Sequence, residues 1–489
     1  MRRLFYLLLL LLFFSCSATR NYNPNKKYSK TQLRQDYSLL RNILEKKHPS
    51  LYWYTSKDSM DYYFDEGYRA IRDSMTELQF GWKILAPLTA NIHCGHTSFS
   101  MSKGWNHLIN NKIIPSFPLY LKVWNDTMMV IANLNEKDSV IKNGDFINAI
   151  NGIKTPELID YMFHFLVEDG YTQNVNYIRL SSDFPYFHRN IFGLYKNYQV
   201  DFTDSNGVAK SATIPYFAPP TDSAEKKKEA IKRKKEKISH SEKIKDIRSL
   251  TYDSTFALMT VNGFSKGHLK SFFRRSFRQL RKDKAKNLVI DIRANGGGDI
   301  IKSVFLTKFL RDTPFKIADS AYAKCNTLRP YTKYISTGFF NNIGLHLVTH
   351  KRKDGNYHFG YWERHTFRPK RKNHFNGEVY ILTNGLTFSA SSLFCSDVKG
   401  QKNITLVGEE TGGGWYGNSG IMIPNITLPH TKLKVRLPVF RLVQYEHIST
   451  KGTGVMPDIY VGPDWRDILN GVDTKIEVVK ELTKEKSPE

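Results

Sequence analysis

Hydrophobic positions in the first hundred residues recur at helical spacing. Apolar side chains at positions 33, 37, 40, 43 and 44 would form one stripe on a helix that begins near Lys30. The helix is predicted to end at His48, because a residue that precedes proline avoids the α conformation. Two more helices are predicted, from about Met60 to Met75 and from about Glu77 to Leu85, the latter stopped by Pro87.

The hydrophobic period shortens between Pro115 and Ile214, which predicts strands. The stretch from Ile141 to Gly152 combines a Gly-Asp turn, a short apolar run and an Asn-Gly pair. Asn-Gly supplies the positive φ angles of a tight hairpin, and a helix is predicted from Pro156 to Phe165. Taken alone, these features indicate a small β domain with one hairpin and one helix.

From Leu250 onward, short apolar runs alternate with helical patterns, which predicts a layered α/β core. The predicted strands are 256–261, 288–292, 379–383, 405–407 and 433–437, and two of the predicted helices are 300–310 and 390–399. No regular structure is predicted for the basic, aromatic stretch 316–375, and loops of that length are often functional. The expected fold class is therefore a multidomain α/β protein.

Composition supports a folded protein of more than one domain. The chain has 489 residues, of which 40% are hydrophobic and 13% aromatic, which excludes wholesale disorder. The net charge is +26, yet the Lys-rich segment from Glu225 to Asp246 holds ten basic and five acidic residues and is predicted to be an exposed linker. No nucleic-acid motif accompanies the charge, so no nucleic-acid partner is expected. A basic proteome or attraction to anionic lipid headgroups would explain the charge.

The N-terminus has the pattern of a secretory signal. Arg2 and Arg3 precede the apolar run from Leu4 to Phe14, which is too short for a transmembrane helix of ~20 residues. The run ends in Ser15-Cys16, which resembles a bacterial lipobox with Cys16 as the lipidated residue. We expect a lipid-anchored protein of the bacterial cell envelope, periplasmic or outer-membrane associated. An ordinary signal followed by a chance cysteine is the alternative.

A glycine-rich turn follows the predicted strand at 288–292. The sequence runs from Asp291 through Arg293 and Asn295 to Gly296, Gly297 and Gly298. Glycines allow backbone N–H groups to point into a site, so this turn could bind a phosphate or form half of an oxyanion hole. No Lys-Ser/Thr follows, which excludes a P-loop. A plain strand-to-helix turn would also need these glycines.

A second motif follows the strand at 379–383. Asn-Gly leads to Thr387-Phe388-Ser389-Ala390-Ser391 at the start of a predicted helix. A serine at this position often caps the helix. The same geometry would let helix N–H groups stabilise an oxyanion formed when Ser389 attacks a carbonyl.

Four segments in order resemble the tail-specific (C-terminal processing) protease family. They are Asp291 to Gly298, Thr387 to Ser392, Gly408 to Gly414, and Gly454-Val455-Met456-Pro457-Asp458. The stretch 141–152 with its following helix resembles a PDZ domain, which binds peptide C-termini by strand addition. The resemblance implies a crotonase-like α/β core, an inserted PDZ-like domain and peptide-bond hydrolysis through an acyl-enzyme. Ser389 matches the family nucleophile, and the N–H groups of Ala390 and of Gly297 or Gly298 match its oxyanion hole.

One position departs from the family pattern. Many members carry a general-base lysine where this chain has Gly414. A serine is a poor nucleophile without a base, so another base must serve or the site is inactive. The tricorn-core branch uses an upstream histidine and a downstream glutamate, and Gly95-His96-Thr97 and Glu446 resemble these. His93 is a weaker rival base, and Thr97 is the nearest substitute for a serine that assists the histidine in that branch.

These features together predict a serine peptidase with Ser389 as nucleophile, His96 as base and Glu446 as the orienting acid. No metal or cofactor is implied, and the substrates would be polypeptides, with recognition of their C-termini one option. A non-catalytic protein that binds peptides or hydrophobic ligands, and an esterase or amidase, are the alternatives. The expected organisation is a signal peptide (1–16), a helical region with His96 (17–110), a PDZ-like domain (111–220), a linker (221–248) and the protease core (249–489).

Overall fold

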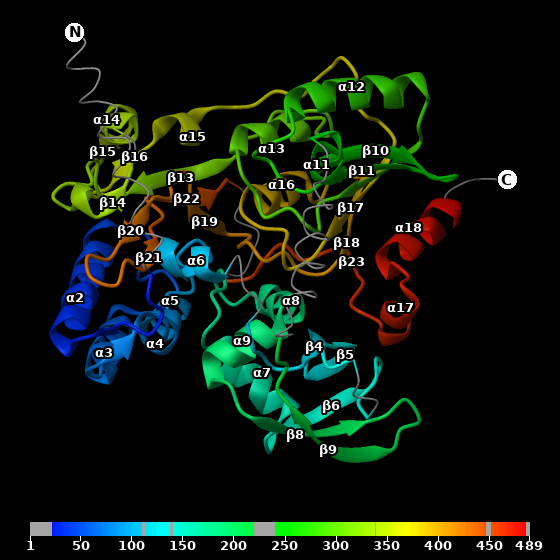
Figure 1. Cartoon of the computed structure of the whole chain (residues 1–489). Helices are drawn as coiled ribbons and strands as arrows, with labels where there is room; N and C mark the ends of the chain where they lie inside the picture. Colours follow the sequence, from blue (N-terminus) through cyan, green and yellow to red (C-terminus); the bar gives the residue numbers. More distant parts are fainter. Residues whose placement is uncertain are drawn as a thin grey trace, which may run out of the picture.

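The computed structural model describes residues 22–109, 114–136, 140–219, 240–337, 339–445 and 451–485. The chain forms an N-terminal helical part, an inserted α/β domain and a larger α/β core (Figure 1). Cys16, Glu446 and most of the predicted linker lie outside the described residues. Within the described ranges, no helix has the length and apolar character needed to cross a bilayer.

The helical part carries His96 and packs on the core. Its helices are α2 (Lys30–Lys47), α3 (Lys57–Ala70), α4 (Glu77–Phe80), α5 (Ala86–Ala90) and α6 (Lys103–Ile109). The apolar stripe predicted on the first helix is buried. The prediction that Pro87 stops the third helix is wrong. A π-helical turn, η1 (Gly81–Leu85), places Pro87 in the first turn of α5, where its missing N–H costs little.

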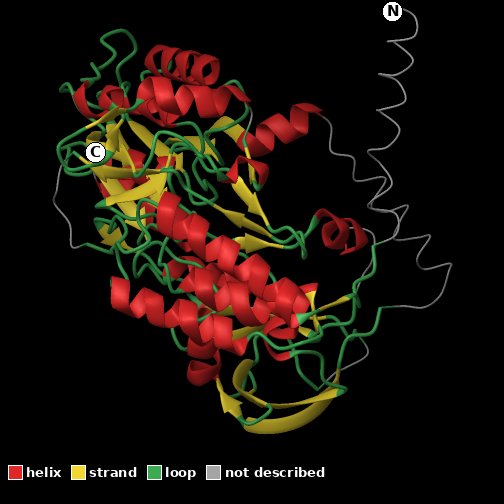
Figure 2. Cartoon of the chain, turned by 90° about the vertical axis from the view of Figure 1, so that its left-hand side faces the viewer, coloured by secondary structure: helices red, strands yellow, loops and turns green. Residues whose placement is uncertain are grey.

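The inserted domain is a six-stranded antiparallel sheet with three helices. The sheet order is β4-β5-β6-β8-β9, formed by β4 (Leu119–Trp124), β5 (Thr127–Asn133), β6 (Phe146–Ile150), β8 (Asn197–Thr203) and β9 (Ala209–Pro215). The predicted hairpin is present, because β7 (Ile153–Lys154) pairs with β6 across Asn151-Gly152. The helices are α7 (Thr155–Phe163), α8 (Asn174–Ser182) and α9 (Phe184–Phe192). In Figure 2 the curved strands at the lower end of the molecule belong to this domain.

A six-stranded sheet forms the centre of the core, in the order β10-β11-β12-β17-β18-β23. The strands are β10 (Arg248–Tyr252), β11 (Ala257–Val261), β12 (Asn287–Asp291), β17 (Glu378–Thr383), β18 (Ile404–Gly408) and β23 (Ile459–Tyr460). All pairs except β10 with β11 are parallel. The ends of β12 and β17 therefore lie at the same edge, and both motifs start there.

Helices cover both faces of this sheet, which explains why its strands are continuous apolar runs. On one face lie α12 (Leu269–Lys282), α13 (Ile300–Thr307) and α16 (Ala390–Val398), whose apolar residues share a buried cluster with the sheet. The C-terminal helix α18 (Thr474–Glu485) covers the other face through Val479. The strands and helices predicted from Leu250 onward are present, with ends displaced by at most three residues. The predicted strand 433–437 is β21 (Lys434–Arg436), which pairs with β3 (Phe99–Ser100) outside this sheet.

The stretch 316–375, for which no regular structure was predicted, contains short elements. They include β13 (Ala318–Ala323), α14 (Phe339–Val348), β16 (Tyr357–His358) and α15 (Gly360–Arg364). β13 pairs with β22 (Phe440–Gln444), which in turn pairs with β19 (Gly417–Gly420) in a second sheet. These strands are short and pair with segments far away in sequence, so local periodicity does not reveal them.

Candidate active site

Ser389 stands at the turn from β17 into α16 in a strained backbone conformation. Its φ is +56° and its ψ is −120°, a combination that costs a non-glycine residue free energy. The serine is the residue before the first helical one, yet its side chain makes no capping hydrogen bond. Its hydroxyl is therefore available for another contact, and the strain fixes the direction in which it points.

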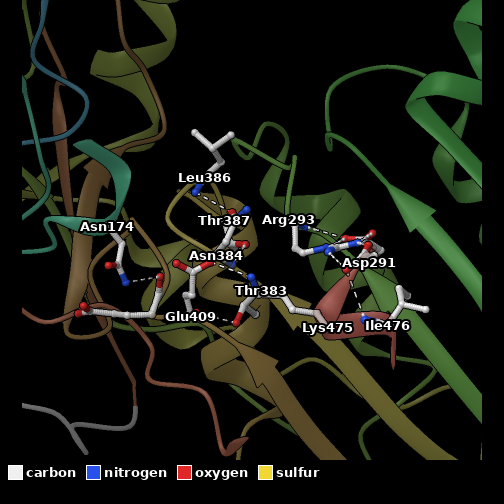
Figure 3. Close-up of polar contacts among 12 residues, drawn as sticks. Asn174, Asp291, Arg293, Thr383, Asn384, Leu386, Thr387, Glu409, Lys475 and Ile476 are labelled. Carbon is white, nitrogen blue, oxygen red and sulfur yellow. Dashed lines mark hydrogen bonds and ion pairs between the residues drawn. The ribbon is translucent and has the colours of Figure 1, made fainter. Parts of the chain in front are cut away.

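The Asn-Gly turn before Ser389 holds it at the end of the sheet. Asn384 Oδ1 accepts a hydrogen bond from the Leu386 N–H at 2.9 Å, and the Asn384 N–H donates to Thr387 Oγ1 at 3.2 Å (Figure 3). The Thr387 hydroxyl donates to the Ile292 carbonyl on the neighbouring strand end at 3.2 Å. These bonds join the second motif to the first.

The glycine turn after β12 packs directly against the serine. Asn295 is fully buried, and its Nδ2 donates to the Val261 carbonyl at 2.9 Å. Gly297 has φ +96°, and a Cβ at this position would lie 2.7 Å from Ser389 Cβ. Only glycine allows this approach without displacement of the serine.

The predicted oxyanion-hole donors differ in their hydrogen bonding. The Gly297 N–H donates to Asn295 Oδ1 at 3.0 Å. Within the described chain, neither Ala390 nor Gly298 uses its N–H in a hydrogen bond. The sequence left open whether Gly297 or Gly298 contributes an N–H group to the oxyanion hole. Of these two, Gly298 is the one whose N–H is unused among the described residues.

His96 reaches Ser389 from the helical part of the chain. Its Nε2 lies 3.0 Å from Ser389 Oγ, and its ring packs on Phe388 with 4.7 Å between the ring centroids. The side chain is only 3% exposed. Burial, helped by the positive charge of Arg436, lowers the pKa of His96 to about 3, so the imidazole is neutral near pH 7.

The second nitrogen of the His96 ring, Nδ1, has no partner among the described residues. Nδ1 is buried and forms no hydrogen bond to any residue within the described ranges. The rival base, His93, instead has its Nδ1 3.3 Å from Glu168. The Thr97 hydroxyl lies 2.7 Å from His48 Nε2, so it contacts a different histidine.

Gly414 has no room for a side chain. A Cβ there would lie 2.8 Å from the Gly417 carbonyl oxygen and 3.3 Å from Asp169 Oδ2. The Gly414 N–H donates to Asp169 Oδ2 at 2.9 Å. Asp169 was not predicted as a site residue from the sequence. Its one local signal is that it begins an Asp-Gly pair.

The arginine of the first motif forms ion pairs at the sheet edge. Arg293 bonds both carboxylate oxygens of Asp291 and both of Asp473, which lies just before α18 (Figure 3). Nearby, Lys475 bonds Glu409 at 2.8 Å. Arg293 thus links the end of β12 to the C-terminal helix and does not reach Ser389.

A cleft of about 370 Å³ opens at the carboxyl ends of β12, β17 and β18. It is lined by Lys122 and Tyr177 of the inserted domain, by Asn384 and Glu409 of the core, and by Tyr460 of β23. Ligands of open α/β sheets bind outside the carboxyl ends of the strands, but neither Ser389 nor His96 lines this cleft. In the described part of the chain, no three His, Cys, Asp or Glu side chains are grouped to hold a metal ion.

Comparisons with known proteins agree with this architecture. Residues 255–461 match the family model described as Peptidase family S41. The structure is similar to mature CPAF (13% identity, 93% of this chain and 97% of that chain, TM-score 0.61) and to mature CPAF complexed with lactacystin (13%, 93% and 98%, TM-score 0.60). No curated protein matches the sequence. Residues 255–461, which make up most of the core, therefore match a Peptidase family S41 domain within a multidomain α/β protein.

Proposed function

We propose that the protein is a serine peptidase in which Ser389 is the nucleophile and His96 the general base. The observation that carries the proposal is the 3.0 Å distance between His96 Nε2 and Ser389 Oγ, which is within reach for proton transfer. The strained backbone of Ser389 and the S41 domain around it support the same role.

The reaction follows from these positions. Ser389 Oγ attacks the substrate carbonyl carbon while its proton passes to His96 Nε2, and the resulting tetrahedral oxyanion faces the Ala390 and Gly298 N–H groups. When the C–N bond breaks, the proton passes from Nε2 to the leaving amine and an acyl-enzyme remains. Water then attacks the ester by the same steps, which regenerates the Ser389 hydroxyl.

Glu446 is proposed as the acid that orients His96. The buried His96 Nδ1, which has no partner within the described ranges, is where such an acid would accept a hydrogen bond. Glu446→Gln should lower kcat more than it changes KM.

A fluorophosphonate probe tests the nucleophile and the base. Labelling of the wild-type protein is expected, with loss in Ser389→Ala and in His96→Ala. Ser391→Ala is a matched control, because this buried serine lies two residues away and its hydroxyl has no partner among the residues that the structure describes. His93→Ala is the control for the histidine. Labelling that persists in Ser389→Ala would contradict the proposal. Lactacystin, which is bound in one CPAF structure, provides a second reagent.

A binding protein without catalysis is the second candidate, and two observations favour it. The Gly297 N–H is occupied, and His96 Nδ1 has no partner among the residues the structure describes. A wild-type protein that is folded, resists the probe and still binds peptides would support this candidate. Hydrolysis of ester substrates but not of peptides would instead indicate an esterase.

Polypeptides are the proposed substrates, with the inserted domain proposed as PDZ-like. Strand addition at its edge strand β4 meets an obstacle, however. Ser181 Oγ of α8 lies 2.8 Å from the Val123 N and 3.1 Å from its carbonyl oxygen. A peptide that added to this edge would have to replace those contacts.

The lipid anchor at Cys16 stays a proposal that rests on the signal-like N-terminus. Cells that express the full chain and its Cys16→Ala variant should differ in the membrane fraction. Equal amounts of the two proteins in that fraction would contradict the anchor.

A further inference from the structure

The segment that joins α7 to α8 leaves the inserted domain and contacts the candidate active site. Asp169, in the middle of this segment, is 1% exposed and accepts two hydrogen bonds from backbone amides. Oδ1 accepts from the Gly95 N–H at 3.2 Å, and Oδ2 accepts from the Gly414 N–H at 2.9 Å. Gly95 directly precedes His96, and Gly414 belongs to the glycine loop beside Ser389.

That glycine loop lies against the nucleophile. A Cβ on Gly413 would come within 2.8 Å of the Ser389 backbone nitrogen. A Cβ on Gly95 would lie 2.5 Å from the ring of Phe388, the residue before Ser389. The Asp169 carboxylate therefore connects two loops that each touch the Phe388-Ser389 segment.

Three further bonds fix the same segment to the surrounding chain. The Gly170 N–H donates to the His93 carbonyl at 2.9 Å, and the Tyr171 N–H donates to the Gly452 carbonyl at 2.8 Å. The Thr172 hydroxyl donates to the Gly412 carbonyl at 3.1 Å. The segment thus bonds both the loop that carries His96 and the loop that follows β18.

The Asp169 carboxyl is buried, and its pKa lies above the ordinary value. Burial raises the pKa of this carboxyl, whereas the two amide bonds and the nearby Arg441 act in the opposite direction. Arg441 is 1% exposed, and its guanidinium stacks on Trp53 at 3.8 Å. A buried carboxylate with two amide partners is costly to leave half-bonded, so the two loops keep a fixed distance.

We propose that Asp169 is a positioning residue that holds His96 against Ser389 by bonding the two loops beside them. Through Asp169, the inserted domain aligns His96 and Ser389, although this domain contributes no catalytic residue itself. This proposal rests on the proposed peptidase function, and it makes contact between the inserted domain and the core a condition for reactivity.

Asp169→Asn tests the proposal. The asparagine side chain has the same size as aspartate, but its NH₂ group replaces one acceptor oxygen and would face a backbone N–H group. The second-order rate of fluorophosphonate labelling is expected to fall about 100-fold, the effect of a misplacement near 1 Å. Asp145→Asn is the control. Asp145 is a buried carboxylate of the same domain that accepts a hydrogen bond from the Lys142 N–H at 2.8 Å within its own turn. It should lose stability without a comparable loss of labelling rate.

A double-mutant cycle separates positioning from general destabilisation. If Asp169 acts through His96, the residual labelling of the double variant Asp169→Asn/His96→Ala, measured at high probe concentration, should be no slower than that of His96→Ala alone. Additive losses in the cycle, or a labelling rate of Asp169→Asn within twofold of wild type, would overturn the proposal.

A readout that does not need activity distinguishes failure of this proposal from failure of the peptidase function. In protein labelled with ¹⁵N-histidine, the His96 ring signals, assigned through their loss in His96→Gln, should move in Asp169→Asn and stay in place in Asp145→Asn. Absence of labelling in the wild-type protein would refute the peptidase function. Unmoved His96 signals in Asp169→Asn would refute the positioning role.

Discussion

His96 Nε2 lies 3.0 Å from Ser389 Oγ, although 293 positions separate the two residues in the chain. The histidine comes from a loop after the N-terminal helices, and the serine comes from the turn between β17 and α16. Between them in the sequence lie the whole inserted domain and half of the core. The contact therefore exists only when the helical part and the core are folded together.

The pH dependence of labelling should show the burial of His96. Since burial lowers the pKa of this imidazole to about 3, the neutral, proton-accepting form persists well below the ordinary value of 6.5. The labelling rate is expected to remain nearly constant from pH 7 down to about pH 5, measured where circular dichroism shows a folded protein. A half-loss of the rate near pH 6.5 would contradict this.

Gly297→Ala should abolish labelling and destabilise the fold. The new Cβ would meet Ser389 Cβ at 2.7 Å at a residue whose φ is +96°, so both sterics and backbone strain oppose it. A loss of about 1–3 kcal/mol in the free energy of unfolding is expected. Gly296→Ala is the matched control, because a Cβ there has no atom within 4 Å. Similar losses in both variants would show that the close approach is unimportant.

Gly414→Lys should not restore the base that many tail-specific proteases use. A side chain at 414 would collide with the Gly417 carbonyl and crowd Asp169. We expect a lower melting temperature and no recovery of labelling when the substitution is added to His96→Ala. Recovery of the labelling rate in that double variant would show that the loop can adapt to a lysine.

Three buried histidines should make the protein less stable in acid. Burial lowers the pKa values of His48, His96 and His188 to about 3, whereas an unfolded chain titrates near 6.5. Between these values the unfolded state binds more protons, so the free energy of unfolding falls as the pH drops below 6.5. The slope is at most about 1.4 kcal/mol per pH unit for each histidine.

Urea unfolding at several pH values measures this slope. His188→Phe provides the comparison, because the His188 ring lies among aromatic rings, with 4.9 Å between its centroid and that of Phe117. In the described part of the chain, its Nδ1 has no hydrogen-bond partner. The variant should lose about one third of the slope if the three histidines contribute equally. A slope unchanged by this substitution would show that other groups cause the acid sensitivity.

Local sequence signals were enough to locate the turn that carries Ser389 and the glycines beside it. Both follow apolar strands of the kind found in a covered parallel sheet, and the strand ends determine where the turns fall. His96 was identified through a resemblance to known proteases, because nothing in its own sequence neighbourhood gives its distance from Ser389. Asp169 was missed, since its partners, Gly95 and Gly414, are far away in sequence and offer only backbone amides.

The separation of His96 and Ser389 along the chain also sets an order in time. At the usual pace of about 5–20 residues per second, the ribosome adds Ser389 roughly 15 to 60 s after His96. A nascent chain therefore holds a histidine and no serine to pair with it for most of its synthesis. If the proposed function is right, newly made protein has no peptidase activity until the last third of the chain has been synthesised and folded.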